Sequence, residues 1–160
     1  MMTTISAQAL LGLYDKDYLK NVSTLGALSD DALMFLLEQG DILQPAAGER
    51  LFSYEDPVDC FYVVLDGQID FYKPCRNGRT LIRQYHRGME IGFVAMIGLH
   101  GRAGDADAGP QPTYLLRVST GLFSDLQQQI PNDFGILLLN LAREMSRRLR
   151  EADIRLAELE

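Results

Sequence analysis

Residues 41–118 form a series of short apolar stretches that are separated by turn residues. The stretches read "DILQ", "RLFS", "CFYVVL", "QIDFYK", "TLIRQY" and "TYLLRV". Tight turns fall at 65–68 and 75–78, and the second contains an Asn-Gly pair that accepts positive φ at both central positions. Many short strands at even spacing predict an antiparallel β-barrel or jelly roll.

Both ends of the chain carry helix signals. In "LSDDALMFLLEQG", Ser29 or Asp30 can cap a helix that Gly40 ends. After the strands, "STGLFSDLQQQ" begins with a hydroxyl cap, and Pro131 opens a long final helix. We therefore predict one mainly β domain of the α+β class over 1–160, with a helical N-terminal part (1–40), a jelly roll (41–118) and C-terminal helices (119–160).

Apolar residues in the final helix recur at alternating spacings of four and three. They are Leu138, Ala142, Met145, Leu149, Ala152, Leu156 and Leu159. This spacing is typical of a coiled-coil seam, and Arg148, Glu151 and Arg155 flank it as charges flank the seam of a dimer. It predicts a parallel homodimer through the C-terminal helix. The alternative is that the stripe packs on the chain's own barrel.

Charge and hydropathy exclude two classes of partner. The formal net charge is -7, and the one dense basic cluster, "REMSRRLR", is followed by acids, so we expect no direct nucleic-acid binding. The apolar runs are much shorter than the roughly 20 residues of a membrane helix, so no membrane contact is expected. Cys60 and Cys75 lack CxxC spacing and no leader precedes them, which predicts a cytoplasmic protein.

The residue inventory offers little for catalysis. His86 and His100 are the only histidines, which is too few for the multi-histidine metal set of a jelly-roll enzyme. No acids occur in a spacing that defines a catalytic pair. We therefore predict no enzymatic activity and no metal site, and we give little weight to haem binding at His100.

The order of elements resembles the cyclic nucleotide-binding domain, and in particular the bacterial catabolite activator family. The resemblance begins near Leu25 and rests on "AAGERLFSYEDPVDCFYVVLDGQIDFYK" and on "RGMEIGFVAMI" followed by Arg102. It implies that the turn at 92–97 opens a short helix whose backbone N–H groups bind a cyclic phosphate. It also implies that Arg102 adds a charge-assisted contact to that phosphate.

By this resemblance the ligand residues are Gly92, Phe93, Val94, Ala95, Arg102 and Ala103, with Ala152 and Asp153 facing the ligand from the C-terminal helix. Phe93 stands where the family carries a glutamate that accepts from the ribose hydroxyl, and Ala103 replaces a hydroxyl residue. Losing a hydrogen bond to a charged group costs roughly 1.5 to 3 kcal/mol, so affinity for an ordinary cyclic nucleotide is expected to fall by roughly a hundredfold or more.

Three further expectations concern this region. Phe93 is expected to fill the vacated pocket as part of the core. Arg102 taken alone is also consistent with a surface arginine. The breakers in "GDADAGPQP" predict that an edge strand of the jelly roll has become a solvated acidic loop that contacts nothing.

Two functions remain open from the sequence. The first is a non-enzymatic regulatory sensor with a degenerate phosphate turn, for a cyclic nucleotide or another small anion, whose chain ends where the family's hinge and helix-turn-helix domain would begin. The second is a ligand-free dimeric scaffold or protein-interaction module, whose protein partner is unknown.

Overall fold

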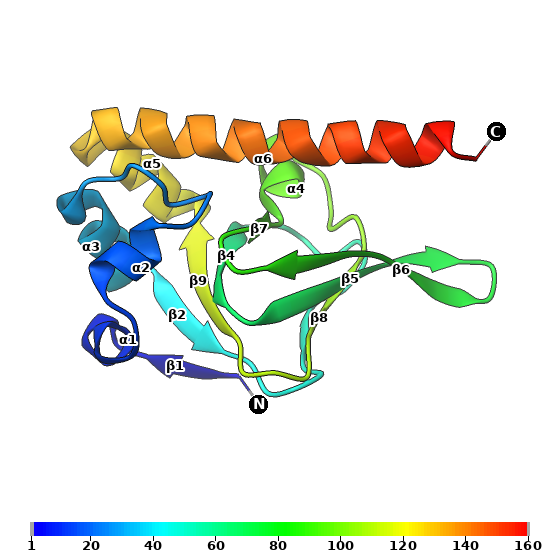
Figure 1. Cartoon of the computed structure of the whole chain (residues 1–160), viewed down its shortest axis with the longest axis horizontal. Helices are drawn as coiled ribbons and strands as arrows, with labels where there is room; N and C mark the ends of the chain where they lie inside the picture. The colour runs from blue at the N-terminus through cyan, green and yellow to red at the C-terminus, as the bar shows by residue number, and fades with distance from the viewer. Residues whose placement is uncertain (1, 160) are drawn as a thin grey trace.

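The computed structural model describes residues 2–159 and shows two antiparallel sheets with helices against them (Figure 1). The strands are β1 (Thr3–Ile5), β2 (Asp41–Gln44), β3 (Arg50–Phe52), β4 (Cys60–Asp66), β5 (Gln68–Cys75), β6 (Gly78–His86), β7 (Glu90–Ile91), β8 (Asp105–Ala108) and β9 (Tyr114–Ser119). The helices are α1 (Ala7–Leu13), α2 (Lys16–Lys20), α3 (Asp30–Gln39), α4 (Phe93–Gly98), α5 (Thr120–Gln129) and α6 (Pro131–Ala157).

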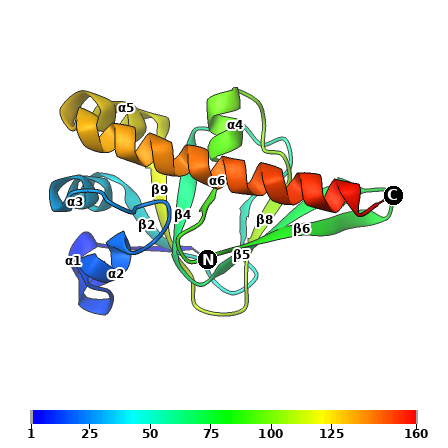
Figure 2. The ribbon, with the colours of Figure 1, turned by 45° about the horizontal axis from the view of Figure 1, so that its top comes forward.

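One sheet has the order β1-β2-β9-β4-β7 and the other has the order β3-β8-β5-β6. Most neighbours in these orders are not consecutive along the chain, as when β4 pairs with β9, whereas β5 and β6 form a hairpin; every pairing is antiparallel. The two sheets and the long helix α6 that runs past them confirm the predicted α+β jelly roll (Figures 1 and 2).

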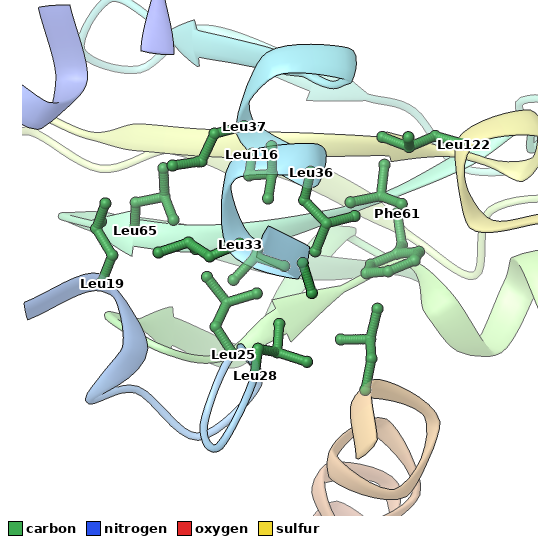
Figure 3. Close-up of a cluster of buried hydrophobic side chains, with 14 of the residues drawn as sticks. Leu19, Leu25, Leu28, Leu33, Leu36, Leu37, Phe61, Leu65, Leu116 and Leu122 are labelled. Carbon is green, nitrogen blue, oxygen red and sulfur yellow. The ribbon is translucent and has the colours of Figure 1, made fainter. Parts of the chain in front are cut away.

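Strand β4 lies at the centre of the fold and is buried on both faces. Successive side chains of a strand point to opposite faces, so Phe61, Val63 and Leu65 join the cluster under the helices. Tyr62 and Val64 point the other way, into the cluster between the sheets. The run "CFYVVL" is continuously apolar because its side chains pack into a hydrophobic cluster on each face of the strand. Figure 3 shows Phe61 and Leu65 among the leucines of the cluster under the helices.

Helices α3 and α6 begin at the capping residue and the proline that the sequence analysis predicted. The Ser29 hydroxyl accepts a hydrogen bond of 3.1 Å from the backbone N–H of Ala32, as an N-cap does, and Gly40 follows the last turn of α3. Pro131 occupies the first turn of α6. Residues 1–40 are not wholly helical as predicted, because Thr3–Ile5 form the edge strand β1.

Helix α6 presents two faces. Leu137, Leu141 and Glu144 are buried against the domain. On the predicted seam, Leu149 and Leu156 are each 65% exposed, and Met145 is the one seam residue that packs partly on the core. The alternative in which the whole stripe packs on its own barrel is therefore wrong.

The acidic segment after Arg102 is a strand, not the loop that the sequence predicted. In β8 the pattern "DADA" alternates, with Ala106 and Ala108 buried and Asp105 and Asp107 turned outward. These aspartates form ion pairs with Arg50 on β3 and with Arg79 on the β5–β6 hairpin. The glycines and prolines of "GDADAGPQP" lie on either side of the strand and do not interrupt it. Arginines from distant segments of the chain neutralise its aspartates.

Candidate functional site

The turn between β7 and α4 depends on the absence of a side chain at Gly92. Its φ is +97°, in the left-handed region that favours glycine. A Cβ built there would lie 2.3 Å from Nη1 of Arg102. Gly92 therefore allows a sharp turn and a close approach of the Arg102 guanidinium to the backbone.

Arg102 lies inside the protein, which overturns its interpretation as a surface arginine. Its side chain is 3% exposed, and its guanidinium donates to the carbonyl oxygens of Gly92 (3.3 Å) and Cys60 (2.9 Å). The guanidinium carbon lies 4.3 Å from the centroid of the Phe52 ring. Its Nε is buried and has no hydrogen-bond partner within residues 2–159.

The charge of Arg102 also has no acidic partner among the residues that the structure describes. Among the ion pairs formed within residues 2–159, none includes Arg102. A buried ion that has lost its hydration costs several kcal/mol unless a counter-charge and hydrogen bonds replace the water. The site is therefore electrostatically incomplete at this residue.

A cavity of about 150 Å³ lies between the jelly roll and α6. Its walls are Phe52, Phe71, Tyr85, Ile91, Gly92, Val94, Ala95, His100, Arg102, Ala103 and Arg148. Five of the six predicted turn residues are in this set, and Phe93 is the exception. The predicted helix residues Ala152 and Asp153 are exposed and outside the walls.

Phe93 does not fill the cavity as predicted, because it points into the opposite core. It follows Gly92 at the start of α4 and is fully buried in the cluster under the helices. Its ring packs edge-on against Phe61 and Phe123, at centroid distances of 5.3 and 5.6 Å. A carboxylate at this position would face the core and not the cavity.

The carboxylate of this site belongs to Glu90, which the sequence analysis missed. Glu90 is fully buried, and its Oε2 accepts a hydrogen bond of 3.1 Å from the backbone N–H of Phe93. Its Oε1 pairs with Arg148 of α6, whose guanidinium also donates to the Glu90 carbonyl oxygen at 3.0 Å. The sequence signal was a lone acid in the apolar segment "MEIGF", but nothing local pointed to Arg148.

Burial and mutual attraction together shift the pKa values of Glu90 and Arg148. Desolvation raises the pKa of the Glu90 carboxyl, and the nearby Arg148 charge opposes that rise. Desolvation acts to lower the pKa of Arg148, but the combined attraction of Glu90, Tyr85 and Glu144 raises it. Arg148 therefore stays cationic and ties α6 to the turn that holds Gly92.

Two more contacts hold the outer half of α6 to the domain. Glu151 pairs with Arg83 on β6, and Arg155 donates to the carbonyl oxygen of Ile82 at 2.9 Å. Both contacts are polar and lie at the surface. Within 2–159, no three His, Cys, Asp or Glu residues are grouped as metal ligands. In the same range, no helix has the length and apolar character needed to cross a membrane.

Comparisons with solved structures identify the class of fold. A cyclic nucleotide-binding domain from Methylobacillus flagellatus superposes with a TM-score of 0.84 at 19% identity, over 99% of this chain and 89% of that one. The Thermus thermophilus catabolite activator protein gives 0.72 at 22% identity, over 86% of this chain and 62% of that one. The c-di-GMP-responsive regulator CLP of Xanthomonas campestris also gives 0.72, at 14% identity, over 82% and 64%.

The fold is therefore that of a cyclic nucleotide-binding domain. The family profile described as "Cyclic nucleotide-binding domain" matches residues 42–129, and the chain belongs to this family. No match was found among curated protein sequences. The matched range includes the turn at Gly92 and Arg102, and it ends before α6.

Proposed function

We propose that this chain is a non-enzymatic regulatory domain that binds one small anionic effector in the cavity beside Arg102. The single observation that carries the proposal is the buried guanidinium of Arg102, which has an unpartnered Nε and no acidic partner among the described residues. An anion in the cavity would supply the missing counter-charge.

The proposed output is a change in the position of α6. Arg148 lines the cavity and also binds the Glu90 carboxylate, so one side chain contacts both the ligand space and the turn before α4. A ligand shifts such an equilibrium only by its difference in affinity for the two states. The polar contacts of Glu151 and Arg155 make the outer half of the helix the part that is easiest to reposition.

We also propose that a second copy of the chain covers the seam of α6 in a parallel homodimer. Leu149 and Leu156 are 65% exposed there at coiled-coil spacing. The double substitution Leu149→Asp with Leu156→Asp should give a monomer by light scattering. The matched control, Leu139→Asp with Ile154→Asp, replaces residues of α6 that are 51% exposed and lie off the seam, and it should stay dimeric. An unchanged dimer in the first variant would refute the seam.

Ligand binding is tested by thermal unfolding with cAMP, cGMP, cyclic dinucleotides and simple anions. A ligand at a hundred times its Kd should stabilise the protein by about 2.7 kcal/mol. Arg102→Met should abolish the effect, whereas Arg76→Met, at an exposed hairpin position, should leave it unchanged.

The second candidate is a ligand-free scaffold. It is favoured by the size of the cavity, because 150 Å³ is below the roughly 300 Å³ at the low end of small-molecule sites. Absence of any shift across the panel would support it over the sensor. Both candidates place the protein in the cytoplasm, a reducing compartment that suits the free thiols of Cys60 and Cys75.

A further inference from the structure

We infer, as an extension that rests on the proposed function, that the effector is an aromatic monocarboxylate of about one ring and not a nucleotide. Three properties of the cavity point to this class of ligand. They are its size, the chemistry of its walls and the number of charges left to neutralise.

The size of the cavity suits a single ring. The cavity volume is about 150 Å³, and a protein cavity of roughly that volume accommodates benzene. A nucleotide adds a bicyclic base, a sugar and a phosphate, and it belongs with ligands whose sites measure roughly 300 Å³ or more. The cavity therefore fits a benzene ring with a small polar group.

The walls suit an aromatic ring. Phe52, Phe71, Tyr85 and Ile91 come from four different strands and line one space. The rings of Phe71 and Tyr85 already meet edge to face with their centroids 6.2 Å apart. A third ring in this space can take the same edge-to-face or offset geometry, which stabilises aromatic pairs beyond the burial of their area.

The charges call for one negative group. Two guanidinium groups line the cavity, but Arg148 is already neutralised by Glu90. Arg102 lines the cavity and alone lacks a counter-charge among the described residues. A planar carboxylate matches a guanidinium fork, and it brings the single negative charge that balances Arg102.

The test is isothermal titration of the full chain with benzoate, acetate, cyclohexanecarboxylate and cAMP. Benzoate should bind about tenfold or more tightly than acetate, since acetate lacks the ring that the apolar walls would bury. It should also bind more tightly than cyclohexanecarboxylate, which has similar size without aromatic character.

Two variants locate the binding. Arg102→Gln should weaken benzoate by about tenfold or more, while Arg76→Gln should leave it unchanged. Ala103→Leu fills the cavity and keeps Arg102, so it should also abolish benzoate binding and serves if Arg102→Gln does not fold.

The outcomes separate this inference from the proposed function. Binding of cAMP without benzoate would overturn the ligand class and leave the effector site standing. Equal affinity for acetate and benzoate, or benzoate binding that survives both cavity variants, would also overturn the ligand class. Failure of every anion to bind would overturn the effector site as well.

Discussion

Gly92→Ala is the sharpest test of how the turn holds Arg102. The added Cβ meets two costs, a φ of +97° and a contact of 2.3 Å with the Arg102 guanidinium. Left-handed backbone costs an alanine roughly 1 to 2 kcal/mol. Moving the guanidinium breaks its hydrogen bonds to Gly92 or Cys60, and each such bond is worth roughly 1.5 to 3 kcal/mol. The expected destabilisation is therefore about 3 kcal/mol or more.

The matched control is Gly48→Ala. Gly48 has a φ of +75°, but a Cβ there meets nothing within 4 Å, so only the backbone cost of roughly 1 to 2 kcal/mol applies. Urea unfolding of both variants measures the difference between their free energies of unfolding. If Gly92→Ala costs no more than Gly48→Ala, the guanidinium is not fixed against the backbone and the account of the site is wrong.

Three further predictions follow from the same structure. Phe93→Glu should destabilise the protein by about 3 kcal/mol or more by urea unfolding, since it buries a charge in the aromatic core, and it should not create cAMP binding; a cost below about 1 kcal/mol would contradict this. Burial raises the pKa of Glu90, so this residue contributes most to stability at low pH. The difference in free energy of unfolding between the wild type and Glu90→Gln, measured by urea unfolding, should therefore shrink as the pH rises above about 4.3; a difference that grows would show that the pKa is lowered. Asp107→Asn should cost about 1 kcal/mol at low salt and less at high salt, because it weakens partly exposed pairs with Arg50 and Arg79; an effect independent of salt would exclude that cause.

Local patterns were enough to predict much of the fold. The run "CFYVVL" predicted a strand, and it became β4, whose two faces both need apolar side chains. Ser29 and Pro131 marked the starts of helices because capping and φ preferences act over a few residues. The resemblance also located five of the eleven wall residues of the cavity, namely Gly92, Val94, Ala95, Arg102 and Ala103.

Errors occurred where a residue's role depends on a distant partner. "DADA" was interpreted as a loop because its aspartates find their arginines only after the sheets assemble. Phe93 was assigned to the cavity, although a strand that ends at a glycine turn sends that side chain to the other core. Local sequence gives no sign of which side of the turn each residue will face.

The sequence by itself determined the class of fold, the starts of α3, α5 and α6 and the spacing of the α6 seam, because each follows from local periodicity, capping or φ preference. Only the tertiary structure decided that Arg102 is buried without an acid and that Glu90 is held by Arg148. Arg148 lies 58 residues from Glu90 along the chain, so the pair exists only when α6 packs against the jelly roll. Burial and charge balance are properties of that packed state, which a linear pattern does not encode.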